Sequence, residues 1–82
     1  MRILKSKQVK KFIEKQDKST QVRLETALNK LPAGDVVPIV GMSDTYRLRV
    51  GSFRAIFVKE KAEEEDVIKV TVLDNRGQVY KK

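Results

Sequence analysis

Residues 46–57 read YRLRVGSFRAIF, and they are the most informative part of the sequence. From Tyr46 to Val50, apolar side chains alternate with arginines, which is the period of two of a β-strand. Phe53 to Val58 has the length and composition of a return strand. Between them, Gly51-Ser52 favours a two-residue type II′ turn, because glycine suits the first central position. The stretch therefore predicts an antiparallel β-hairpin.

The turn also predicts the register of the hairpin. With Gly51-Ser52 at its centre, Arg49 pairs with Arg54. Alternation assigns one set of side chains to the face expected to meet helices: Tyr46, Leu48, Val50, Phe53, Ala55 and Phe57. The opposite face receives Arg47, Arg49, Arg54, Ile56 and Val58.

The arginine-bearing face is a candidate phosphate site. Like charges directly across a strand pair are unfavourable by roughly 0.2–1 kcal/mol, whereas a bound phosphate reverses that sign. Guanidinium is the fork-shaped, permanently charged group that suits phosphate oxygens. The alternative is that the arginines lie on a solvated face and pair with the acids of residues 60–66.

The charge of the chain agrees with a polyanion partner without requiring one. The net charge is +7 over 82 residues, and five of the acids fall within residues 60–66, so the remainder is strongly basic. The sequence has no cysteine and no histidine, which excludes thiolate chemistry and a histidine base. No apolar run approaches the roughly 20 residues of a membrane span, so we expect a cytoplasmic protein with no membrane contact.

The rest of the chain predicts two helices and further strands. Residues 6–16 and 17–31 carry apolar side chains at helical spacing, the second helix being capped by Asp17 or Ser19 and ended at Pro32. Strands are expected at residues 1–4, at 67–73 and at 78–80, and residues 36–40 are expected to form an edge strand or a loop.

The predicted fold class is α+β, with a single domain over residues 1–82. An N-terminal strand precedes an αα-hairpin, and a twisted antiparallel meander sheet of three to four strands follows. The expected order is β-α-α-β-β-β, with both helices packed on one face of the sheet.

The hairpin, followed by the Arg-x-x-x-Tyr that runs from Arg76 to Tyr80, resembles the RelE/ParE toxin superfamily. Residues 28–35, LNKLPAGD, also resemble the segment of that family between second helix and sheet. Similarity to the RelE branch implies a toxin that cuts mRNA in the ribosomal A site and thereby inhibits translation. It also implies a cognate antitoxin as partner, in a hetero-oligomer.

The resemblance implies metal-free phosphoryl transfer, with no cofactor, in which the RNA 2′-hydroxyl attacks the adjacent phosphate. It assigns catalytic roles to Arg49, Arg54, Arg76 and Tyr80, and RNA-binding roles to Arg47, Arg49, Lys59 and Lys81. Several members carry lysines where this chain has Arg47 and Arg49, and related branches place a histidine near the site. Two other readings stay open: a ParE-like inhibitor of DNA gyrase, and an inactive module that only binds antitoxin.

Overall fold

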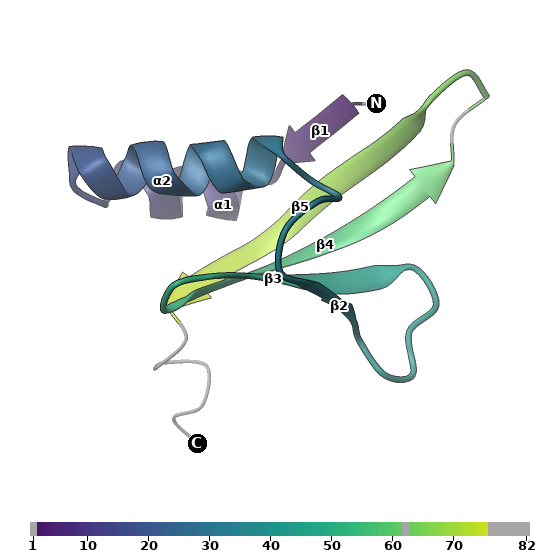
Figure 1. Ribbon diagram of the computed structural model, residues 1–82. Helices are drawn as coiled ribbons and strands as arrows, with labels where there is room; N and C mark the ends of the chain where they lie inside the picture. The colour runs from purple at the N-terminus through teal and green to yellow at the C-terminus, as the bar shows by residue number, and fades with distance from the viewer. Residues whose placement is uncertain (1, 62, 76–82) are drawn as a thin grey trace.

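The computed structural model describes residues 2–61 and 63–75. The elements in chain order are β1 (Arg2–Lys5), α1 (Lys7–Glu14), α2 (Lys18–Asn29), β2 (Val36–Pro38), β3 (Thr45–Val50), β4 (Phe53–Lys61) and β5 (Asp66–Asn75). The two helices lie side by side over one face of a twisted sheet (Figure 1). Neither of these helices is long and apolar enough to cross a membrane.

The sheet differs from the predicted meander, and that prediction was wrong. Five strands form one sheet in the order β1-β5-β4-β3-β2. β1 pairs parallel with β5, whereas the other neighbours are antiparallel, so the sheet is mixed. One strand precedes the helices and four follow them, which replaces the expected β-α-α-β-β-β order. The strand predicted at residues 78–80 lies outside the described residues.

The parallel pairing of β1 with β5 was not indicated by the sequence because β1 is so short. β1 contains only Arg2–Lys5, and its partner β5 lies at the other end of the described chain. A parallel pair needs a long crossover, and here α1, α2 and the three intervening strands supply it. Local patterns of apolar residues carry no information about such a distant partner.

The hairpin prediction is confirmed in register and in turn type. Arg49 pairs with Arg54, and Tyr46 pairs with Phe57. Gly51 has φ of 60°, and the described residues contain no positive φ outside glycine, so Ser52 has negative φ. Positive φ at the first central residue alone is the signature of a type II′ turn.

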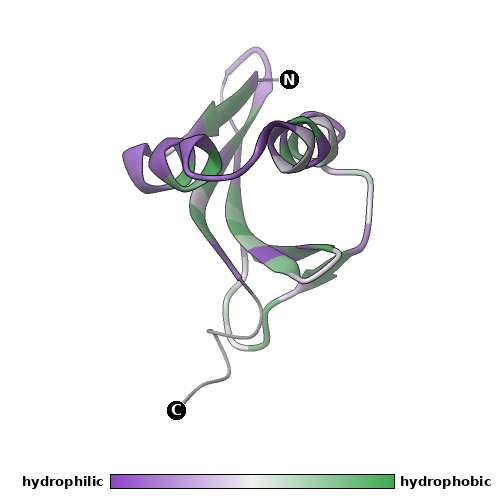
Figure 2. Ribbon diagram, turned by 90° about the vertical axis from the view of Figure 1, so that its left-hand side faces the viewer, coloured by the Kyte–Doolittle hydropathy of each residue, from purple (hydrophilic) through white to green (hydrophobic). Residues whose placement is uncertain are grey.

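The core lies between the helices and the sheet. Eleven described apolar side chains are buried: Val9, Ile13, Leu24, Leu28, Leu31, Leu48, Ala55, Phe57, Ile68, Val70 and Leu73. They come from both helices, from position 31 just after α2, and from one side of β3, β4 and β5, which packs against the helices. Figure 2 shows hydrophobic stretches, in green, along the strands beside the helices. The pattern matches the face that the sequence assigned to the helices.

The start of α1 completes the edge of β5 beyond the end of β1. Ser6 caps α1 by accepting a hydrogen bond from the backbone N–H of Val9, and its own N–H donates to the carbonyl of Val70 at 3.0 Å. Two residues on, the Gln8 amide pairs with Leu73, donating from Nε2 to its carbonyl and accepting from its N–H, each at 3.0 Å. A side-chain amide therefore continues the strand pairing that β1 begins.

Candidate nucleic-acid interface

The three arginines of the hairpin lie on the face of the sheet opposite the helices. Arg49 stands directly across from Arg54, and Arg47 stands across from Ile56. Directly opposed residues in an antiparallel pair share a face, and the neighbours Leu48 and Ala55 point into the core on the other side. Within residues 2–61 and 63–75, no helix or strand covers this second face (Figures 1 and 2), which we call the open face.

Two carboxylates flank the arginine pair. Asp35, just before β2, forms an ion pair with Arg49, with 3.3 Å between Oδ2 and Nε. On the other side, Asp74 of β5 stands directly across from Arg54. The open face therefore carries a row that runs Asp35, Arg49, Arg54, Asp74, and we call these four residues the charged row. Its two positive charges are balanced by two negative ones.

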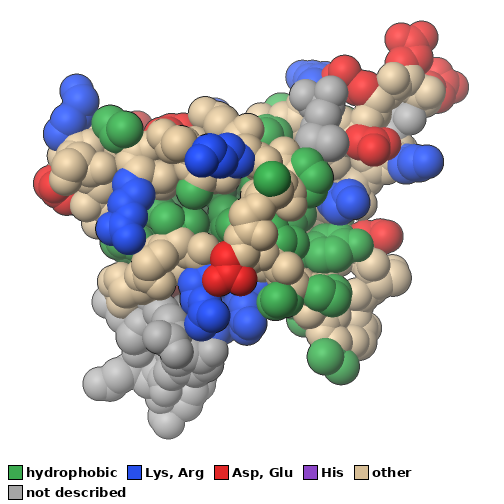
Figure 3. Space-filling view, viewed as in Figure 1, with side chains coloured by type: hydrophobic (Ala, Val, Ile, Leu, Met, Phe, Trp, Pro, Cys, Tyr) green, Lys and Arg blue, Asp and Glu red, His purple; other side chains and the backbone are tan. Residues whose placement is uncertain are grey.

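The acid that pairs with Arg49 is not one of those expected from the sequence. Among the acids of residues 60–66, Glu60 pairs with Lys69 at 3.2 Å, at the other end of β4. Figure 3 shows acidic side chains gathered over the β4–β5 turn, and a group of basic side chains beside a carboxylate at the opposite end of the molecule. Sequence reasoning missed Asp35 and Asp74, because their positions depend on the registers of β2 and β5.

The surroundings of the row combine charge with exposed apolar surface. Arg47 and Arg54 are half-buried, whereas the Arg49 side chain is 48% exposed. Val72 stands opposite Ile56 on the same face and is 42% exposed. Such a face can bind the charged backbone of a ligand through its arginines, while its apolar side chains contact uncharged parts of the same ligand.

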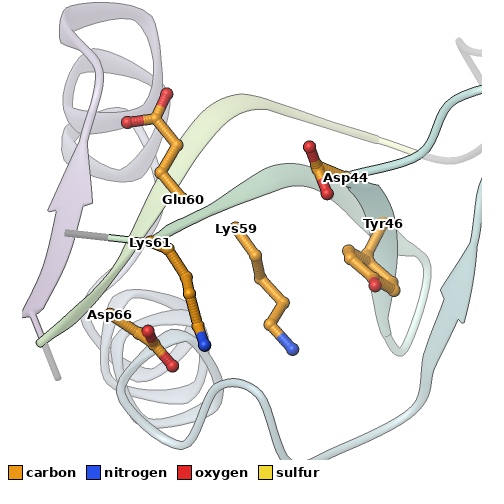
Figure 4. A pocket seen from close by; sticks show the side chains of 6 residues that line it. All are labelled: Asp44, Tyr46, Lys59, Glu60, Lys61 and Asp66. Atoms are coloured by element: carbon orange, nitrogen blue, oxygen red, sulfur yellow. The ribbon is translucent and has the colours of Figure 1, made fainter.

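Lys59 does not join the arginines. It lies two residues after the buried Phe57 and across from the buried Ile68, so it projects on the helix side of the sheet. Its Nζ lies 5.5 Å from the ring centroid of Tyr46. In Figure 4 the side chains of Lys59 and Lys61 point to one side and that of Glu60 to the other.

The residues around Lys59 line an open pocket of about 550 Å³: Asp44, Tyr46, Lys59, Glu60, Lys61 and Asp66. Acids and lysines both contribute to this pocket, and the Tyr46 ring stacks on Phe57 with 5.5 Å between centroids. Three acids against two lysines give it no preference for an anion. Lys59 therefore lies away from the charged row, on the other face of the sheet.

The remaining residues of the expected site are Arg76, Tyr80 and Lys81, and they lie outside the described residues. β5 ends at Asn75, which pairs with Phe53 next to the hairpin turn. The last described residue is therefore at the same end of the sheet as Arg49 and Arg54, and Arg76 follows it directly in the sequence.

The proteins similar to this chain were found among solved structures. No family model and no curated protein sequence matches the chain. A chain of the archaeal RelE–RelB complex from Pyrococcus horikoshii OT3 is similar with a TM-score of 0.70 and 29% identity, over 94% of this chain and 96% of that one.

A chain of the RelB–RelE antitoxin–toxin complex from Methanococcus jannaschii is similar with a TM-score of 0.69, over 94% of each chain. At 19% identity this second likeness shows the fold alone. Both neighbours are chains from complexes of RelE with RelB.

Proposed function

We propose that this chain is the toxin of a toxin–antitoxin pair and an endoribonuclease that cuts mRNA on the ribosome. The observation that carries the proposal is the pairing of Arg49 with Arg54 on the open face, with Arg47 beside them. Two guanidinium groups at adjacent strand positions offer parallel N–H donors to the oxygens of one phosphate. In the free chain Asp35 pairs with Arg49 and Asp74 stands across from Arg54, and a phosphate can take the place of such a carboxylate.

The toxin role fits this chain better than the antitoxin role. The described residues bury eleven apolar side chains between their own helices and sheet, so the chain has a core without a partner. A segment that folds only on binding lacks apolar surface of that kind. The net charge of +7 also suits a protein that binds RNA phosphates.

The reaction we propose uses the RNA as its own nucleophile. The 2′-hydroxyl loses its proton and attacks the adjacent phosphorus, and the bond from phosphorus to the 5′-oxygen of the next nucleotide breaks. The products are a cyclic 2′,3′-phosphate and a 5′-hydroxyl, which takes up a proton. Since the chain has no histidine, positioning of the phosphate and the 2′-hydroxyl supplies most of the rate.

Each proposed residue has a role in that step. Arg54 and Arg76, with Arg49 directly across from Arg54, hold the non-bridging oxygens and stabilise the charge that grows on them. Arg47 and Arg49 orient the RNA backbone, and Tyr80 stacks on a base or assists proton transfer. Lys81 adds a contact to the backbone, and Lys59 contacts RNA that extends to the helix side.

The cognate antitoxin is the proposed protein partner. Basic and exposed apolar side chains share the open face, including Val72 at 42% exposure and Leu4 at 39%. An acidic segment that folds on binding can cover both kinds of side chain at once. Such a segment would neutralise the arginines and keep RNA away from them.

Primer extension on cellular mRNA after induction of the protein tests this function. Wild type should give cuts within translated codons, and Arg76→Ala and Arg49→Ala should lose them while retaining the melting temperature. Lys61→Ala is the matched control, because it removes an exposed cation at the other end of β4 and on the helix side. Gyrase-dependent DNA breaks, the absence of any cleavage by wild type, or undiminished cutting by Arg76→Ala would each overturn the proposal.

A further inference from the structure

We infer that the Asp35 carboxylate occupies the phosphate position beside Arg49 in the free protein and is displaced when RNA binds. This inference rests on the proposed function and deepens it, since it concerns how the same site admits its ligand. Asp35 is not a catalytic residue in this scheme. It is a positioning residue that acts through Arg49.

The contact has the chemistry of a stand-in for phosphate. A carboxylate and a phosphate both present anionic oxygens to the guanidinium fork. Asp35 Oδ2 lies 3.3 Å from Nε of Arg49, so it occupies one of the donors that a phosphate on the charged row would use. The side chains are 58% and 48% exposed respectively, which leaves the pair open to exchange with a ligand from solvent.

The backbone keeps Asp35 in place independently of its side chain. The N–H of Arg49 donates to the Asp35 carbonyl at 3.0 Å. Just before it, Gly34 has φ of 123°, and the N–H of Val36 donates to the Gly34 carbonyl at 2.9 Å. The turn and the start of β2 therefore hold position 35 next to Arg49, and the carboxylate can leave the guanidinium without disturbing the fold.

The exchange matters because the four residues of the charged row have no net charge together. With Asp35 in place, the row presents two cations and two carboxylates to an approaching RNA. Exposed ion pairs contribute little to stability, so a phosphate held by two arginines can displace Asp35. Asp35 therefore weakens the binding of a polyanion that contacts the row only loosely more than it weakens the binding of a phosphate held by both arginines.

Asp35→Asn tests the inference, with Glu64→Gln as its matched control. Both variants replace an exposed acid by its amide and raise the net charge equally, but Glu64 lies in the β4–β5 turn, at the far end of β4 from the charged row. Binding is measured by fluorescence anisotropy with a short single-stranded RNA whose 2′-O-methyl groups prevent cleavage. Each titration is repeated over a range of salt concentrations.

Asp35→Asn should bind this RNA about two- to fivefold more tightly than wild type at low salt. The slope of log K against log salt should steepen by about 0.7, because one further cation becomes available to phosphate. Glu64→Gln should leave the slope unchanged. In an Arg49→Ala background, Asp35→Asn should have no effect, since it acts only through Arg49.

The outcomes separate this inference from the proposed function. If wild type binds and Arg49→Ala weakens binding, but Asp35→Asn behaves like Glu64→Gln, the inference is wrong and the function stands. A gain for Asp35→Asn that persists without Arg49 also overturns it, because the effect is then general charge. If neither wild type nor Asp35→Asn binds the RNA, the inference and the RNA-binding function fail together.

Discussion

The guanidinium of Arg23, on α2, lies against Gly51 in the turn between β3 and β4. A Cβ at position 51 would lie 2.6 Å from Nη2 of Arg23, closer than side chains approach one another. The same glycine has φ of 60°, in the left-handed region. Two features therefore favour glycine at this position: the positive φ of the turn and the close approach of Arg23 from α2.

Gly51→Ala should destabilise the protein by about 1–2 kcal/mol, mainly because of the left-handed backbone. The end of an arginine side chain moves at little cost, so the contact with Arg23 should contribute less. Urea unfolding of Gly51→Ala, Gly51→Asn and the double variant Gly51→Ala/Arg23→Ala distinguishes the two features. Asparagine should be milder than alanine, and removal of Arg23 should restore little; full rescue by Arg23→Ala would show that the contact dominates.

The Gln8 amide should be a specific support of β5. Gln8→Ala leaves the N–H and carbonyl of Leu73 without the partner they have at 3.0 Å, at a cost of about 1–3 kcal/mol. Hydrogen exchange at the Leu73 amide should accelerate together with that loss. Gln21→Ala is the comparison, because its amide bonds only to carbonyls near the link between the helices. Unchanged exchange at Leu73 in Gln8→Ala would contradict the assignment.

The hairpin could be predicted because its information is local. Gly51-Ser52 specifies the turn, and alternation then specifies every pair from Val50–Phe53 to Tyr46–Phe57, all of which the structure confirms. The parallel pairing of β1 with β5 could not be predicted, because it depends on the packing of the helices that separate them. A strand of four residues carries too little pattern to identify a partner.

The candidate site divides in the same way. The common face of Arg47, Arg49 and Arg54 follows from the period of two within one hairpin. Asp35 and Asp74 join that face only through β2 and β5, whose registers no local pattern specifies. Lys59 shares a strand with Arg54 but differs from it by an odd number of positions, so the same alternation places it on the helix side.

The two faces of α2 should respond very differently to loss of side-chain volume. Leu24 is fully buried, whereas Val22 on the same helix is 55% exposed. Leu24→Ala should cost about 2–5 kcal/mol through lost burial and the cavity it leaves. Val22→Ala should change stability by less than about 0.5 kcal/mol. Chemical denaturation of both variants checks this, and equal losses would show that α2 does not pack in the orientation described.

The N-terminus of α2 should make a contribution to stability that depends on pH. Side-chain hydrogen bonds from Thr20 and Ser19 hold the pKa of Asp17 below its ordinary value of 3.8, and the Ser19 hydroxyl lies 2.9 Å from Oδ2. A lowered pKa means that the fold favours the carboxylate, so the contribution is present above the ordinary pKa and is lost as the pH falls through the folded value.

Asp17→Asn should therefore have a lower melting temperature than wild type at neutral pH, and the difference between the two should shrink as the pH falls below 3.8. In a Ser19→Ala background, Asp17→Asn should lower the melting temperature by less, because one of the hydrogen bonds that favour the carboxylate is already absent. A gap between wild type and Asp17→Asn that stays constant through this acid range would mean that the ionised carboxylate does not stabilise the helix.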